Sequence, residues 1–72
     1  MIDFTVIIAG PERHDGEEPY VYVVRDEGSA AASEAVVTHF KAEQGTDDVV
    51  VLSVEAGFPS STCGYAWNDL RV

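Results

Sequence analysis

The sequence predicts an α+β domain of the two-layer sandwich type, with a β-β-α-β order and one helix on one face of an antiparallel sheet. Three runs rich in apolar and β-branched residues, at 2–9, 20–25 and 48–56, are typical of strands, and the alanine-rich segment before the third run is typical of a helix. The length of 72 residues suits one domain, so we expect residues 1–72 to fold as a single unit.

The first two strands are predicted from their residue types and from the breakers between them. The run 2–9 begins with alternating polarity and becomes continuously apolar, as in a strand buried on both faces. Gly10 and Pro11 end this run, and the polar residues up to Pro19 are typical of a loop. The Tyr and Val residues of 20–25 then predict a second strand, for which antiparallel pairing with the first is the simplest arrangement.

The helix is predicted from about Ser29 to Gln44. Apolar residues spaced four apart form one stripe along it, made of Ala32, Val36 and Phe40. Either Asp26 or Ser29 can serve as the N-cap, because each carries a side-chain oxygen that can accept from an unpaired helix amide. Gly45 can adopt the left-handed conformation that ends many helices.

The order of the elements also predicts the order of the strands. A strand-helix-strand crossover makes the third strand parallel to the second and therefore antiparallel to the first. The first strand then lies in the centre, and the sheet order is 2-1-3. The segment Tyr65-Ala66-Trp67 is either a short C-terminal fourth strand or an aromatic flap, and the sequence leaves both open.

The sheet face away from the helix is expected to carry an apolar row that does not stay bare. The residues predicted there are Ile7, Val49 and Val51, together with either Tyr20, Tyr22 and Val24 or Val21 and Val23. Such a row usually marks an interface. Either the segment with Tyr65 and Trp67 covers it, or a second copy of the chain does so in a homodimer.

Acidity limits the partners of the chain. Thirteen Asp and Glu stand against four Lys and Arg, a net charge of −9, although 46% of the residues are hydrophobic. Nucleic acid and anionic membranes bind through clustered Lys and Arg, so we expect neither as a direct partner. A partner protein with a basic surface is favoured. The sequence leaves open that the acidity serves solubility alone.

The predicted topology gathers many of these acids at one end of the sheet, where the first strand and the helix finish and the third strand starts. The acids expected there are Glu12, Asp15, Glu17, Glu18, Glu43, Asp47 and Asp48. Only Arg13 and Lys41 lie nearby to offset them. We expect this end, together with the sheet-face residues Ile7, Tyr20, Tyr22, Val49, Val51 and Trp67, to supply the protein-interaction surface.

No residue pattern predicts catalysis, a cofactor or a metal site. Zinc sites use several His and Cys ligands, and the single Cys63 with only His14 and His39 offers too few. A catalytic cysteine also needs a nearby base, which acidic surroundings do not supply. A lone cysteine suits a reducing compartment, and Met1-Ile2-Asp3-Phe4 lacks the basic start of a signal peptide, so we expect a cytoplasmic location.

The strand runs Phe4-Thr5-Val6-Ile7-Ile8, Tyr20-Val21-Tyr22-Val23-Val24 and 49–57, with the alanine-rich helix between them, resemble small acidic proteins encoded by actinobacteriophages. This resemblance implies a compact protein that binds host or phage proteins, in the host cytoplasm. The Tyr-containing second strand followed by a helix with Ala and Glu is also similar to the core of HicB-type antitoxins, although no appended DNA-binding segment is present. We therefore expect a non-enzymatic interaction module that modulates a host or phage protein; the alternative is an acidic DNA mimic or HicB-like antitoxin that occupies a basic site.

Overall fold

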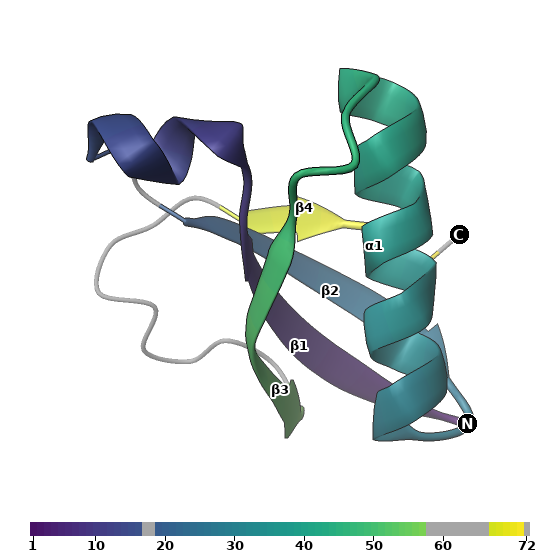
Figure 1. Ribbon diagram of the computed structural model, residues 1–72. Helices are drawn as coiled ribbons and strands as arrows, with labels where there is room; N and C mark the ends of the chain where they lie inside the picture. Colours follow the sequence, from purple (N-terminus) through teal and green to yellow (C-terminus); the bar gives the residue numbers. More distant parts are fainter. Residues whose placement is uncertain (17–18, 58–66, 72) are drawn as a thin grey trace.

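Strand β1 (Ile2–Ala9) forms the centre of a four-stranded sheet of order β3-β1-β2-β4, with helix α1 (Ser29–Gln44) packed on one face (Figure 1). The computed structural model describes residues 1–16, 19–57 and 67–71. Strands β2 (Tyr20–Asp26) and β3 (Val50–Ala56) both pair antiparallel with β1. The predicted α+β fold and the predicted order 2-1-3 are confirmed.

The fourth strand, β4 (Trp67–Asp69), extends the sheet beyond β2 and runs parallel to it, so the sheet is mixed and not wholly antiparallel. Trp67 therefore belongs to a strand, while Tyr65 and Ala66 lie outside the described residues. Three residues are too few to show the alternation by which a strand is recognised. The backbone N–H of Leu70 continues the pairing by donating to the carbonyl of Val23 at 2.7 Å.

The helix begins and ends where the sequence predicts, but its first turn is capped differently. The N-cap is Gly28, which has no side chain to accept a bond, and Ser29 is already the first helical residue. The carboxylate of Asp26 accepts instead from the N–H of Glu27 at 2.8 Å, so both predicted N-caps are wrong. At the other end Gly45 has φ 64° and donates to the Lys41 carbonyl at 2.8 Å, as predicted.

The polar loop after β1 contains one short helix that the sequence analysis did not predict. A 3₁₀ helix, η1, covers Pro11–Asp15. Proline suits the first turn of a helix because its φ is already fixed and its missing N–H would have no partner there. Of the rest of the predicted loop, residues 17–18 lie outside the described part of the chain.

The core lies between the sheet and α1. Its buried members are Phe4, Val6, Ile8, Tyr22, Val24, Ala32, Val36 and Phe40. The predicted helix stripe is thus confirmed, and the Tyr20 ring packs against that of Phe40 with centroids 5.2 Å apart. The Cα radius of gyration, 11.4 Å, is close to the value of about 11 Å expected for a globular chain of this length.

A β-bulge in β3 changes which of its residues face the helix. Ile7 pairs with Ser53 and Ile8 with Val51, so Leu52 has no partner on β1. A bulge adds one residue to one strand and shifts the alternation of its side chains. Val49 consequently packs against the helix-side core, and Val51 shares the face of the buried Ile8. The prediction that Val49 and Val51 point away from the helix is therefore wrong.

The sheet face opposite α1 is not left bare. Of the two alternatives predicted for β2, the structure places Tyr20, Tyr22 and Val24 on the helix side, so Val21 and Val23 face the other way. Val21 and Val23 are nevertheless fully buried, and they lie between β1 and β4 in the register of the sheet. Along β2 the predicted apolar row is therefore covered within a single chain, without a second copy.

Candidate functional site

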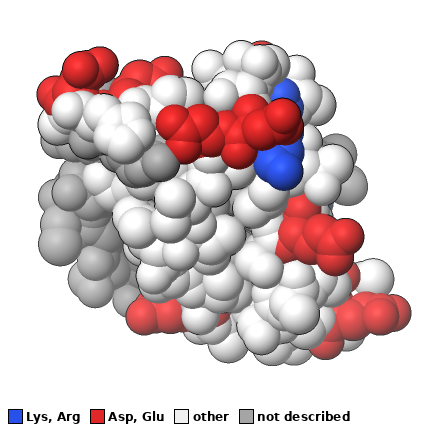
Figure 2. All heavy atoms as spheres, in the orientation of Figure 1, with Lys and Arg blue, Asp and Glu red and all other residues white. Residues whose placement is uncertain are grey.

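Acidic residues from three separate segments meet at one end of the sheet, as the topology predicts. We call this end the acidic pole and define it by the described residues Glu12, Asp15, Glu43, Asp47 and Asp48. η1, the last turn of α1 and the start of β3 lie together there (Figure 1), and red spheres follow this end of the molecule in Figure 2. Glu17 and Glu18 lie outside the described residues.

Local hydrogen bonds hold the segment that carries Asp47 and Asp48. The N–H of Asp48 donates to Thr46 Oγ1, and the N–H of Val49 donates to the Asp47 carbonyl, each at 3.1 Å. These bonds turn the chain sharply between α1 and β3. The carboxylate of Asp48 lies 3.7 Å from His14 Nε2, which connects the segment with η1.

The helix side of the pole carries a contact between a histidine and a carboxylate. His39 Nε2 lies 2.9 Å from Glu43 Oε2, one turn further along α1, and the His39 ring meets the edge of Tyr22 with centroids 5.9 Å apart. Lys41 lies in the last turn of α1, and η1 contains Arg13. The charge of Lys41 is also favourable beside the negative end of the helix dipole.

Glu12 differs from the other pole acids because part of its carboxylate is shielded from solvent. Its Oε2 atom is buried and has no hydrogen-bond partner among the described residues. The same oxygen would lie 3.0 Å from a Cβ at Gly10, beside the ring of Phe40. The side chain of Glu12 is thus folded back onto the end of the core.

Two of the four cationic side chains are engaged at the other end of the sheet. Arg25 Nε donates to Asp3 at 2.9 Å, while Arg71 contacts Asp69 at 2.7 Å and Asp3 at 3.3 Å. The hydrogen bond from Arg25 lowers the pKa of Asp3 below its ordinary value, and hydrogen bonds from Arg71 lower the pKa of Asp69 to about 2. These arginines therefore neutralise local carboxylates and leave the pole acidic.

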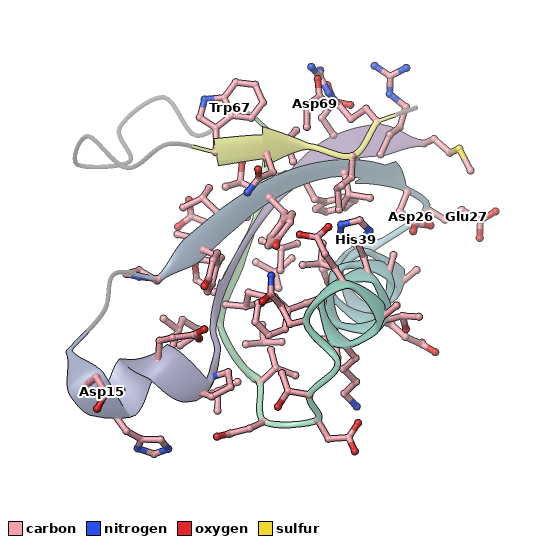
Figure 3. All side chains as sticks on the ribbon, turned by 90° about the horizontal axis from the view of Figure 1, so that it is seen from above. Asp15, Asp26, Glu27, His39, Trp67 and Asp69 are labelled. Carbon is pink, nitrogen blue, oxygen red and sulfur yellow. The ribbon has the colours of Figure 1, made fainter. Side chains whose placement is uncertain are left out.

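The predicted sheet-face residues do not form one surface. Tyr22 is only 3% exposed, Val49 packs against the core, and Tyr20 is half-buried against Phe40. Ile7 is half-buried on the face opposite α1. Trp67 on β4 is 41% exposed, and its side chain extends on the side of the sheet away from α1 (Figure 3).

A surface that the sequence analysis did not single out lies along the outer margin of β3. Three successive large apolar residues are exposed there: Val50 at 43%, Val51 at 38% and Leu52 at 55%. We call residues 50–56 with their outer backbone the β3 edge. The bulge is responsible for the exposure of Leu52. No feature of the apolar run at 49–52 predicted a bulge at that position.

The described residues offer no enclosed site. No cavity is found among them, and no three His, Cys, Asp or Glu side chains gather as metal ligands in residues 1–16, 19–57 and 67–71. Cys63 falls outside these ranges. The one long helix in the described part, α1, is too short and too polar to cross a bilayer.

The fold and its surfaces define a small α+β domain with one helix on a mixed four-stranded sheet, an acidic pole and one long open edge. Comparison of the chain with protein-family models, with curated proteins and with solved structures finds no match.

Proposed function

We propose that this protein is a non-enzymatic interaction module that binds a basic surface of a partner protein through its acidic pole. The observation that carries the proposal is the convergence of acids from distant parts of the sequence. Five described acids from three segments lie at one end with Lys41 and with η1, which contains Arg13, while Arg25 and Arg71 are engaged by carboxylates at the other end.

The geometry of the pole supports a role in recognition beyond solubility. Its acids lie on a short 3₁₀ helix, on a helix end and on a hydrogen-bonded turn, so the backbone positions that carry them are set before binding. A backbone that is ordered before binding loses less conformational entropy when it binds than a flexible loop does. Clustered charge also speeds the encounter with a partner of opposite sign.

The resemblance to small acidic phage proteins supports the same class of function. On that basis the partner is a host or phage protein whose activity the module modulates. We propose a protein as the partner, since the long apolar strand beside the pole offers contacts of the kind that protein interfaces use.

The test compares two double variants that remove equal charge from different ends. Glu43→Gln with Asp47→Asn changes the pole, and Asp26→Asn with Glu27→Gln changes the turn between β2 and α1. Each protein is immobilised, partners are captured from a lysate at low salt, and the captured proteins are identified and remeasured in purified form. We expect the pole variant to lose at least about tenfold in affinity, a change of about 1.4 kcal/mol, and the matched control to bind like the wild type.

Equal weakening by the two variants would contradict a role for the pole in particular. Addition of duplex DNA as a competitor separates the proposal from the mimicry of nucleic acid. Displacement of the module by DNA from the same basic surface would favour the DNA-mimic alternative.

A further inference from the structure

The β3 edge is the longest unpaired strand margin in the described part of the chain. β3 has seven residues and lies at the end of the order β3-β1-β2-β4, so one side of it faces no described strand. At the opposite margin β4 has only three residues, and the Arg71 ion pairs follow it directly. A partner strand therefore has far more backbone available at β3.

The pairing of β3 with β1 determines which of its backbone groups point outward. The N–H of Gly57 donates to the carbonyl of Asp3 at 2.7 Å, which makes these facing residues a hydrogen-bonded pair. Such pairs alternate with non-bonded pairs along an antiparallel ladder, so Glu55 and Ser53 also bond to β1. The N–H and C=O groups of Val54 and Ala56 consequently face away from β1, toward the open side.

The β3 edge lacks most of the features that protect exposed edges in other proteins. Natural edge strands are commonly short, or carry Lys or Pro, so that no foreign strand pairs with them. β3 contains neither residue, and Glu55 is its one charged side chain. The bulge at Leu52 interrupts the ladder, but residues 53–56 beyond it remain regularly paired with β1.

Charge indicates which kind of strand fits this edge. Asp47 and Asp48 precede β3, and Glu55 lies near its end, so a pairing segment meets carboxylates at both ends. A second copy aligned antiparallel would bring Glu55 of each chain toward the Asp47–Asp48 segment of the other. It would also combine two net charges of −9. Lys or Arg in the pairing segment turns the same positions into attractive contacts.

We propose that the β3 edge binds an extended segment of the partner protein that contains apolar residues and Lys or Arg, which adds a fifth strand to the sheet. This inference rests on the proposed function, because it says how a basic partner docks beside the acidic pole. Main-chain hydrogen bonds supply affinity in this mode of recognition, and side-chain contacts on alternate residues supply specificity. On the β3 edge, the exposed side chains of Val51 and Leu52 supply the apolar contacts.

The probe is a fluorescein-labelled peptide of alternating Val and Lys, together with a twin in which every backbone amide is N-methylated. The twin keeps the charge but donates no backbone hydrogen bond. We expect the full-length protein to bind the first peptide at least about tenfold more tightly than the twin, since several main-chain bonds are lost together. Equal binding of the two peptides would overturn strand pairing.

Variants at Ala56 test the site itself. Ala56 is exposed, and its N–H points outward, so Ala56→Pro removes an outward donor and spares the bonds to β1. Ala56→Thr keeps the N–H and is the matched control. We expect the proline variant to lose about tenfold in peptide affinity and the threonine variant to bind like the wild type, with unchanged circular dichroism in both.

Two further outcomes separate this inference from the proposed function. If both peptides and both Ala56 variants bind alike, but Glu43→Gln with Asp47→Asn weakens binding, the edge inference fails and the role of the pole stands. If that pole variant binds the peptides as the wild type does, the proposed function fails. Sedimentation that finds a dimer which Ala56→Pro dissociates, with no peptide binding, would overturn the inference in favour of a second copy.

Discussion

Gly10 lies against the ring of Phe40 at the point where β1 ends. A Cβ built on Gly10 would approach Phe40 Cζ to 2.6 Å and Glu12 Oε2 to 3.0 Å. The ring is fully buried and belongs to the core, so it has little room to move away. Gly10 is therefore required for a close approach as well as for ending the strand.

We expect Gly10→Ala to lower the free energy of unfolding by about 1–3 kcal/mol, the usual cost of forcing extra volume into a packed core. Urea denaturation at constant pH measures this change. Gly28→Ala is the matched control, since no atom lies within 4 Å of its Cβ position. The control should stay within about 0.5 kcal/mol of the wild type, because the entropy gained offsets a poorer N-cap. Equal losses in the two variants would contradict a steric role for Gly10.

Tyr22 provides a prediction about titration. Burial of its hydroxyl raises the pKa above the ordinary value of 10.0, and the charge of Glu43 adds to the effect. The unfolded chain therefore loses this proton at lower pH than the native protein does, and stability should fall as the pH rises above 10.0. Tyr22→Phe should remove this part of the alkaline decline.

The measurement is the chemical shift of Tyr22 Cζ as a function of pH, with the resonance identified by its loss in Tyr22→Phe. A midpoint at or below 10.0 would contradict the burial of the hydroxyl.

At the scale of single elements, strong periodicity was predictable and local irregularities were not. The stripe of Ala32, Val36 and Phe40, with Gly45 after the helix, defined α1 because spacing and cap chemistry indicate the same helix. The bulge at Leu52 has no corresponding sequence signal, because a run of Val and Leu fits either register equally well. β4 was only one of two alternatives, since two of its three residues, Asn68 and Asp69, are disfavoured in strands.

An ion pair between Arg71 and Asp69 holds the end of β4. The stabilisation that this pair gives the folded protein therefore depends on pH. Hydrogen bonds from Arg71 lower the pKa of Asp69 from 3.8 to about 2, so the native state binds this proton more weakly than the unfolded state. The resulting stabilisation is fully present above about pH 4 and is lost as the pH falls toward 2. We expect Asp69→Asn to flatten this part of the acid denaturation curve.

Arg71→Gln tests the cause of that pKa. Without the guanidinium, the carboxyl of Asp69 should titrate near 3.8, as followed by the shift of its Cγ resonance. If Asp69 still titrated near 2 in Arg71→Gln, another group would have to hold its carboxylate.

For the molecule as a whole, the location of the acidic pole followed from topology, whereas the β3 edge required the structure. The acids lie far apart in sequence, from Glu12 to Asp48, yet strand order alone brings their segments to one end. Which apolar residues remain exposed depends on register and on a bulge, which hydrophobicity does not reveal. The apolar face is covered along β2, and the exposed large apolar residues Val50, Val51 and Leu52 lie instead along the β3 edge.

The concentration of charge at the pole predicts how stability depends on salt. Like charges repel in the compact state, and the Debye length falls from about 30 Å at 0.01 M salt to about 10 Å at 0.1 M, so added NaCl should stabilise the wild type. Glu43→Gln with Asp47→Asn should raise the free energy of unfolding at 0.01 M by about 1 kcal/mol and reduce its rise with salt. Urea denaturation across a series of NaCl concentrations measures both quantities.

The matched control tests whether the salt dependence of stability comes from the local cluster of acids or from the net charge alone. Asp26→Asn with Glu27→Gln also removes two negative charges, but these residues lie at the end of β2 and in the turn before α1, far from Asp15 in Figure 3. Arg25 and Arg71 lie at that end and offset part of its negative charge, so removal of the charges of Asp26 and Glu27 should change the salt dependence about half as much or less. If the two double variants had the same salt dependence, the repulsion would arise from the total charge of −9, and the pole would have no separate electrostatic effect on folding.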